Sequence, residues 1–371
     1  NIIGNVPHLR FPEFSGEWEM ASLQDIAAIN PKSDQLQNTF IYIDLEAVEK
    51  GELRKIQEIM REEAPSRAQR VINNNDILFQ CVRPYQKNNY IHKILNTSNQ
   101  QWVASTGYAQ IRTTESPNYI YHLLNTDGFN RKVMVRCTGS SYPAINSEDL
   151  ATIRFYYTPD KKEQFKISRL LDLIDERIAT QNKIIEDLKK LKSAISERLF
   201  NAIKGDVVVL EDIGDVVKGK QINGEFLSES GKYYVMNGGI EPSGFYNDYN
   251  VEANTISISE GGNSCGYVQF NACPFWSGGH CYTIQNTTDN VKTEYLYQFL
   301  KSKESEIMKL RIGSGLPNIQ KKDLAKFKIT IPNISEQKVI SAFLSSFERK
   351  ADVEMNFVNL LLEEKQYLLR Q

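Results

Sequence analysis

The stretch Gly139-Ser-Ser-Tyr-Pro-Ala-Ile145 recurs as Gly313-Ser-Gly-Leu-Pro-Asn-Ile319, and Asp149-Leu-Ala151 recurs as Asp323-Leu-Ala325. Both pairs are separated by the same 174 positions, the difference between residues 313 and 139. A fixed spacing between similar segments is the signature of an internal repeat, in which one structural unit is built twice. The chain of 371 residues is therefore predicted to contain two related units, each large enough for its own core.

Further anchors extend the repeat in both directions, and the spacing shortens to 173 at the last of them. They pair Leu23–Ala27 with Leu210–Gly214, Tyr119–Leu124 with Tyr295–Leu300, Pro159 with Pro332, and Glu163-Gln164 with Glu336-Gln337. Between the anchors the two copies diverge almost completely. A repeated frame with a divergent middle predicts one scaffold that presents two different specificities.

After each Pro and Glu-Gln pair, the sequence changes to a long heptad pattern without internal Pro or Gly. The a and d positions of the first copy are Ile167, Leu171, Ile174, Ile178, Gln181, Ile185, Leu188, Lys192, Ile195 and Leu199, and those of the second are Ile340, Leu344, Phe347, Ala351, Glu354, Val358, Leu361, Lys365 and Leu368. Both copies thus carry a polar third a residue and a Lys at the fourth d position. An apolar seam sustained over four heptads predicts two long helices that pair as an antiparallel coiled coil. The alternative is a helix that packs only on a globular core.

The divergent segments show short strand patterns with turn residues between them. Strands are predicted at 75–79, 110–112, 255–259, 266–270 and 281–284, and shorter helices at 49–63, 116–124 and 293–309. The predicted fold class is α+β, with two repeated α/β modules that are each followed by a long α-helix. The predicted divisions are a first module at 1–158, a central helix at 159–203, a second module at 204–331 and a C-terminal helix at 332–371.

Composition narrows the class of protein. With 41% hydrophobic and 24% charged residues the chain is typical of a globular protein, and no apolar run approaches the about 20 residues that a membrane span requires. The first residues, Asn1–Val6, have neither a basic region nor a long apolar run, so a cytoplasmic location is expected. The net charge of −2 gives no sign of a broad basic face. A sequence-specific nucleic-acid reader requires only a few convergent Arg and Lys residues.

The five cysteines favour reduced thiols over disulfides, because they are odd in number and scattered without a Cys-x-x-Cys pair. Cys265, Cys273 and Cys281 lie near His280 in the sequence, but their wide spacing lacks the paired knuckle of a zinc site. Small buried core thiols are the favoured interpretation.

This architecture resembles the specificity subunit of type I restriction-modification enzymes over nearly the whole chain, from Val6–Phe14 and Trp18-Glu19 through both helices. Tyr234–Gly244, Gly313–Ile319 and Ile331–Gln337 are particularly similar to the family. The resemblance implies that each module is a target recognition domain for one half of a split, asymmetric site on double-stranded DNA. It implies that the paired helices set the gap between the halves and dock two methyltransferase subunits, to which two ATP-driven restriction subunits can add. S-adenosylmethionine, ATP and magnesium would then be bound by the partner subunits.

Three enzyme-like matches fail on inspection. Gly214–Gln221 imitates a phosphate-binding loop but ends in Gln, which lacks the hydroxyl that ligates magnesium. Pro159-Asp160 with Glu163 and Lys166 resembles a nuclease signature, yet lies at a helix start, where acids favour the helix dipole. Gly313-Ser-Gly315 lacks the third Gly of a dinucleotide fingerprint. No box for a flipped adenine is found, so no catalytic residue is predicted. A DNA-modifying enzyme with its own site and a coiled-coil scaffold remain the alternative functions.

DNA contacts are expected from loops in which polar side chains or glycine backbone can reach base edges or phosphates. In the first module the candidates are Gln80, Arg83, Tyr85, Lys87, Ser105, Thr106, Arg136, Ser140, Ser141 and Tyr142. In the second module they are Lys218, Lys220, Asn237, Gly238, Gly239, Ser243, Asn263, Ser264, His280, Arg311 and Ser314. For any single residue the alternative is a solvated turn.

Overall fold

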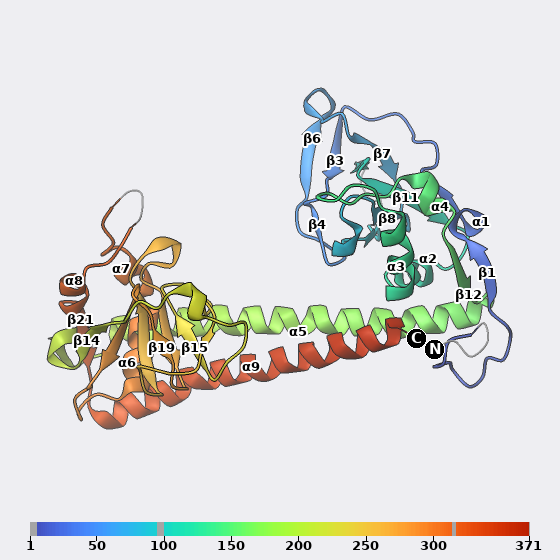
Figure 1. Ribbon diagram of the computed structural model, residues 1–371. Helices are drawn as coiled ribbons and strands as arrows, with labels where there is room; N and C mark the ends of the chain where they lie inside the picture. The colour runs from blue at the N-terminus through green and yellow to red at the C-terminus, as the bar shows by residue number, and fades with distance from the viewer. Residues whose placement is uncertain (1–5, 95–99, 314–316, 371) are drawn as a thin grey trace. The chain divides into compact units, whose positions relative to one another are not determined.

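The computed structural model describes residues 6–94, 100–313 and 317–370, and it divides into two compact units (Figure 1). The first unit holds residues 1–181 and 357–371, and the second holds residues 182–356. Each unit therefore contains one α/β module together with a part of each long helix.

The first module alternates short strands and short helices. Its elements are β1 (Glu19–Ser22), α1 (Leu23–Ile26), β2 (Ala27–Ile29), β3 (Thr39–Ile43), β4 (Val48–Glu49), β5 (Glu52–Leu53), β6 (Gln57–Met60), η1 (Arg61–Glu63), β7 (Ala68–Ile72), β8 (Ile77–Gln80), η2 (Pro84–Gln86), β9 (Tyr90–Ile91), β10 (Gln101–Ser105), β11 (Tyr108–Thr113), α2 (Pro117–Leu124), α3 (Asp127–Arg136), α4 (Ser147–Ala151) and β12 (Arg154–Tyr157). The long helix α5 (Lys161–Ala202) follows.

The second module has a related but shorter order of elements. Its elements are β13 (Asp206–Val209), η3 (Leu210–Asp212), β14 (Asp215–Lys218), η4 (Gly224–Phe226), β15 (Tyr233–Met236), β16 (Phe245–Tyr246), β17 (Thr255–Ser259), η5 (Gly262–Ser264), β18 (Val268–Asn271), β19 (Trp276–Ser277), β20 (Cys281–Gln285), α6 (Thr293–Ser302), α7 (Glu304–Met308), α8 (Lys321–Ala325) and β21 (Lys328–Ile331). The long helix α9 (Ile334–Arg370) follows.

The sheets of the two modules share a common core topology, which the divergent sequences do not reveal, although β7 and the β4–β5 hairpin of the first module have no counterpart in the second. An antiparallel four-stranded sheet runs β2-β11-β8-β9 in the first module and β14-β20-β17-β18 in the second. A further sheet contains one parallel pair in each module, β3 with β10 and β15 with β19. β1 pairs with β12 as β13 pairs with β21. The modules are therefore two versions of one fold, with α2 and α6 packed against equivalent sheets.

The predicted helical seam is confirmed in both long helices. Every a and d position of α5 and α9 is buried or half-buried, including the polar third a residues Gln181 and Glu354. The exposed positions between them carry most of the charge, as expected of an amphipathic helix whose apolar stripe faces a partner.

Ion pairs between the two helices show that they run antiparallel. In the first unit Lys365 Nζ donates to Asp175 Oδ1 at 2.5 Å, and in the second unit Lys192 Nζ donates to Glu348 Oε1 at 2.7 Å. The repeat spacing of 173 relates Lys192 to Lys365 and Asp175 to Glu348. The two seam lysines predicted from the heptads are therefore equivalent members of equivalent pairs. Half-buried pairs of this kind fix the register of a coiled coil.

A buried glutamine joins each long helix to its module. Gln164 accepts a hydrogen bond from the Ser116 main-chain nitrogen at 3.0 Å and donates to the Thr158 carbonyl at 2.8 Å. Gln337 accepts from the Lys292 main-chain nitrogen at 2.8 Å and donates to the carbonyl of Pro332 at 2.9 Å. Both glutamines are fully buried, and each helix start is thereby fixed to the N-terminus of α2 or α6.

The predicted helix at 49–63 is wrong. The segment forms the hairpin β4–β5, strand β6 and the short η1 instead. Lys50 and Gly51 connect β4 to β5 with φ of +50° and +84°, which is the left-handed geometry of a two-residue hairpin turn. In this hairpin region Arg54 bonds Glu52 at 2.7 Å.

Other boundaries differ from prediction by local turns. The predicted strand at 75–79 begins at Ile77, because Asn75 has a φ of +71° and Asp76 accepts a hydrogen bond from the Asn73 main-chain nitrogen. The predicted strand at 266–270 begins at Val268, after Gly266 with a φ of +90°. The predicted helix at 293–309 is interrupted at Lys303 and divides into α6 and α7. Among the described helices, none is long and apolar enough to span a bilayer.

Candidate nucleic-acid interface

Two loops of the first module meet at the end of strand β8. The Arg83 main-chain nitrogen donates to the Pro143 carbonyl at 2.8 Å, and the Ile145 nitrogen donates to the Cys81 carbonyl at 3.0 Å. These bonds bring residues 81–87, directly after β8, against the repeated stretch 139–145. Two sets of candidate residues that are distant in sequence therefore form one surface.

The second module builds the same loop frame from different residues. The Gly262 nitrogen donates to the Pro317 carbonyl at 3.0 Å, and the Ile319 nitrogen donates to the Glu260 carbonyl at 2.8 Å. Gly262 thus occupies the place of Arg83, and both residues have left-handed backbone, with φ of +73° and +54°. The two modules therefore share the main-chain bonds of this loop frame and differ in its side chains.

Arg83 has a left-handed backbone and lies against an aromatic ring. Its guanidinium lies over the Tyr142 ring, 4.4 Å from the centroid. Left-handed backbone at a non-glycine residue costs about 1 kcal/mol, so the surrounding bonds must hold it there. Arginine stacked on an aromatic ring keeps its N–H fork free for an acceptor. Ser140, Ser141 and Tyr85 are exposed beside it.

Other first-module candidates are bonded within the protein. Gln80 is buried, and its side chain donates to Gln86 Oε1 at 3.0 Å and accepts from the Asn88 nitrogen. Lys87 bonds Asp127 Oδ1 at 2.7 Å. Through these bonds, Gln80 and Lys87 help to hold the loop of residues 81–87 in place.

Three further candidates of the first module lie outside this loop pair. Arg136 is exposed and donates to the Asp149 carbonyl and to Thr152 Oγ1, both at 2.8 Å. Ser105 is buried and accepts from the Gly107 nitrogen, and Thr106 is half-buried at the adjacent turn.

In the second module a charged cluster lies at the ends of β14 and β17. Lys218 Nζ donates to Glu260 Oε1 at 2.6 Å, and His280 Nδ1 lies 3.4 Å from Glu260 Oε2. The His280 main-chain nitrogen donates to Asn237 Oδ1, and the Gly238 carbonyl accepts from Ser259 Oγ at 2.6 Å. The structure therefore brings four candidates, Lys218, Asn237, Gly238 and His280, to one place.

The remaining second-module candidates differ in their exposure to solvent. Lys220, Ser243, Asn263 and Arg311 are exposed, and Gly239 and Ser264 are half-buried. The Lys220 carbonyl accepts from Trp276 Nε1 at 2.9 Å, and the Ser243 nitrogen donates to the Val235 carbonyl. Ser314 lies outside the described residues.

Glu260 is the residue that sequence reasoning missed. Its side chain is only 10% exposed and accepts from both Lys218 Nζ and Tyr282 Oη, the latter at 3.0 Å. Burial is the main cause that raises the pKa of Tyr282, so its hydroxyl stays protonated and donates. An acid directly after the predicted strand 255–259 and before Gly261-Gly262 was the available signal in the sequence.

The buried cysteines are core residues rather than metal ligands. Burial raises the pKa of the Cys81 and Cys281 thiols to about 11, so both stay protonated. In the described part of the chain, no group of three or more His, Cys, Asp or Glu side chains is arranged to hold a metal ion.

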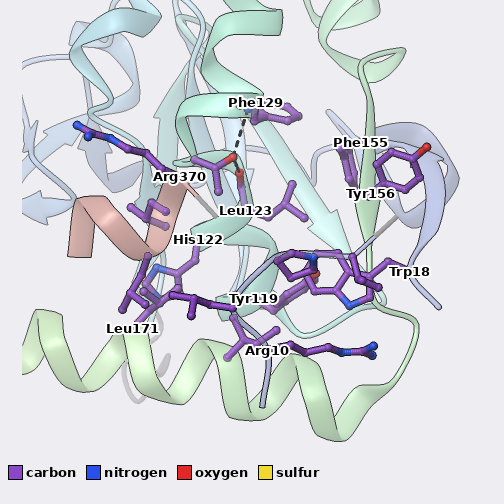
Figure 2. A pocket seen from close by; sticks show the side chains of 18 of the residues that line it. Arg10, Trp18, Tyr119, His122, Leu123, Phe129, Phe155, Tyr156, Leu171 and Arg370 are labelled. Atoms are coloured by element: carbon purple, nitrogen blue, oxygen red, sulfur yellow. Dashed lines mark hydrogen bonds between the residues drawn. The ribbon is translucent and has the colours of Figure 1, made fainter. Parts of the chain in front are cut away.

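An apolar cavity of about 670 Å³ lies in the first unit (Figure 2). Trp18, Tyr119, Leu123 and Leu171 line it, and the Arg10–Glu163 ion pair at 2.6 Å forms part of its wall. None of the candidate DNA-binding residues lines this cavity.

In the second unit, Phe200 packs against the residues that the repeat relates to two lining residues of this cavity. The repeat relates Tyr119 and Leu123 to Tyr295 and Phe299, and the Phe200 ring lies edge to face with both, at 5.8 Å and 5.3 Å.

Comparison with known proteins gives one consistent result. Residues 15–190 and 204–361 both match the family described as "Type I restriction modification DNA specificity domain". A putative type I specificity subunit of Mycoplasma pneumoniae is 34% identical over 156 residues, which cover 42% of this chain and 40% of the relative. The type I restriction enzyme MjaVIII specificity subunit of Methanocaldococcus jannaschii is 22% identical, covering 93% of this chain and 89% of the relative.

Solved structures share the fold. The type I restriction-modification S subunit from M. genitalium superposes with a TM-score of 0.66 at 17% identity, over 100% of this chain and 98% of that one. A chain from a study of complex assembly in the type I system gives 0.62 at 21% identity, over 98% of each chain. The matches to the first two curated relatives span 40% and 58% of those relatives' lengths.

Proposed function

Because the chain belongs to the type I restriction-modification DNA specificity family, whose members are non-catalytic subunits, we propose that its two modules each read one half of a split DNA target. The observation that carries this proposal is the loop frame built twice. The main-chain bonds of Arg83 and Gly262 to Pro143 and Pro317 are the same, while the exposed side chains around them differ. A symmetric target would require like side chains, so the proposed target is asymmetric.

Base readout is proposed for the polar side chains at each frame, with the half-buried Arg83 as the leading residue of the first module. Arginine pairs with the O6 and N7 acceptors of guanine through two parallel hydrogen bonds. The other exposed loop residues contribute phosphate or base contacts, and the buried Gln80 holds the loop in shape. The alternative functions lack support, since a scaffold does not need two differently elaborated loop surfaces.

The paired helices are proposed to dock two methyltransferase subunits. Apolar residues are exposed at repeat-related positions on α5 and α9: Leu170 and Phe343 are 40% and 47% exposed, and Ile184 and Phe357 are 37% and 36% exposed. Exposed apolar side chains on a helix face mark sites of protein association. Repeat-related sites suit two copies of one partner. Two restriction subunits would join this assembly, and S-adenosylmethionine, ATP and magnesium would be bound by the partners.

The test is to express the chain with its methyltransferase subunits and to sequence modified bases in the host genome. The expected result is one motif with two defined halves and an undefined gap, which disappears when the chain is deleted. Methyl transfer by the isolated chain would support the enzyme alternative. A motif that persists without the chain would support the scaffold alternative.

Replacement of Arg83 by alanine is expected to weaken recognition of one half-site in the assembled complex. A lost base contact relaxes one target position by about 1–3 kcal/mol, and a lost phosphate contact lowers the salt slope of binding by about one unit. DNA binding measured against salt and against single-base variants separates these results. Arg54→Ala is the matched control, because Arg54 is an exposed arginine bonded to Glu52 on the β4–β5 hairpin. If affinity, slope and base preference all stay unchanged, Arg83 is a solvated turn residue.

A further inference from the structure

The loop frame of each module carries one more exposed side chain, at a repeat-related position outside the candidate residues. In the first module Thr138 and Ala144 exchange two main-chain hydrogen bonds, both of 2.9 Å. In the second module Ile312 and Asn318 exchange the same two bonds, at 2.8 Å and 3.0 Å. The repeat spacing of 174 relates Thr138 to Ile312, and both side chains are exposed. The two main chains are therefore held alike at this position, and the side chains differ.

Ile312 is an apolar side chain that the second module leaves on the surface of its loop frame. It is 48% exposed, whereas Ile319, which follows the same loop, is fully buried in the core. Asn318 forms β-bridges with both Ile312 and Gly261. Ile312 therefore lies beside the Gly261-Gly262 turn, on the surface that corresponds to that of Arg83 in the first module.

The chemistry of the side chain limits what Ile312 can contact on DNA. Isoleucine has no hydrogen-bond donor or acceptor for a phosphate or for the polar edge of a base. The apolar group that base pairs present in the major groove is the C5-methyl group of thymine. A thymine methyl packed against Ile312 removes apolar surface of both partners from water, which favours the contact. Thr138 presents a hydroxyl group at the same position, so the two modules differ here in the kind of group that they can read.

We propose that Ile312 contacts the C5-methyl group of a thymine in the second half-site and thereby distinguishes thymine from cytosine at one position. The inference rests on the proposed DNA-reading function and adds a specificity-determining residue to it. The two main-chain bonds to Asn318 hold Ile312 in place for this contact. The side chain itself touches the methyl group.

The experiment removes the methyl group and nothing else. Deoxyuridine pairs as thymidine does but lacks the C5-methyl group. In a duplex that carries the motif methylated by the assembled complex, each thymine of the second half-site is replaced in turn by uracil, on either strand. Binding of the complex is expected to weaken about fourfold at one position, which corresponds to burial of one methyl group at about 0.8 kcal/mol.

Variants of Ile312 assign the effect to this side chain. Ile312→Ala should bind the thymine and uracil duplexes equally well at that position, while Ile312→Val, which keeps two methyl groups, should retain most of the difference. Ile240→Ala is the matched control, because Ile240 is an isoleucine of the same module that is 51% exposed but lies outside the 312–318 loop. This control variant should keep the full difference of about fourfold.

A wild-type complex that binds every uracil duplex as tightly as the unmodified duplex overturns the inference, and so does a second half-site without an A·T pair. A difference that survives in Ile312→Ala, or that disappears in Ile240→Ala, also overturns it, since the methyl contact then belongs to another residue. In all these cases the unmodified duplex is still bound. Failure to bind the unmodified duplex overturns the proposed function itself.

Discussion

A chain whose residues 1–158 are replaced by the corresponding module of a relative should direct methylation to a target with one new half and one unchanged half. The reason is that the first module has cores of its own, built almost entirely from residues before 158. Its attachment to α5 at Gln164 uses main-chain atoms of Ser116 and Thr158. Sequencing of modified bases in cells that carry the exchanged chain gives the motif directly.

The reciprocal exchange of residues 204–331 is the control, and it should alter only the other half. Both exchanged chains should keep the same gap between the halves, since neither changes the helices. A motif in which both halves change after a single exchange would contradict independent reading by the two modules.

Insertion of one heptad into both long helices, after Ile185 and after Val358, should lengthen the gap between the half-sites by about three base pairs. Seven residues add about 10 Å of helix, and base pairs are about 3.4 Å apart along DNA. The two insertions lie between the Asp175–Lys365 pair and the Lys192–Glu348 pair along each helix, so both ion pairs keep their partners. The seam also stays in phase, because seven residues restore the a and d positions.

The same insertion in α5 alone is the control. This variant leaves α9 unchanged. The Lys192–Glu348 and Asp175–Lys365 pairs can then no longer form at the same time. DNA modification by the assembled complex should therefore be lost. The measurement is again the motif read from modified genomic bases. An active double-insertion variant with an unchanged gap would show that helix length does not set the spacing.

The long helices could be predicted almost to the residue, because a heptad pattern is local and repeats many times. Helices expected at 159–203 and 332–371 are observed at 161–202 and 334–370. Strands of the antiparallel sheets were also predicted where β-branched residues alternate with small polar ones, as in the fully buried β17. The strands β3, β6 and β7 in the region 39–72 were not predicted, because they are short and pair with strands that are distant in the sequence.

The loop surface could be predicted only in part. Arg83 and Tyr142 were both singled out as polar loop residues, but nothing local says that one stacks on the other across 59 positions. The equivalence of Cys81 and Glu260 rests on main-chain hydrogen bonds, and the side chains themselves share no property. For this reason the charged cluster of the second module could not be assembled from the sequence, although two of its three members were candidates.

The left-handed residue at the start of each recognition loop is also an engineering opportunity. At Gly262 the direction of a Cβ atom meets nothing within 4 Å, and the main chain there is already held in place by its bond to Pro317. The first module shows that an arginine side chain is tolerated at the corresponding position for a modest conformational cost. Randomised side chains at position 262, with asparagine and aspartate favoured by their tolerance of this backbone, would therefore explore new sequence preferences without rebuilding the fold. The second module carries an unused position for a reading side chain.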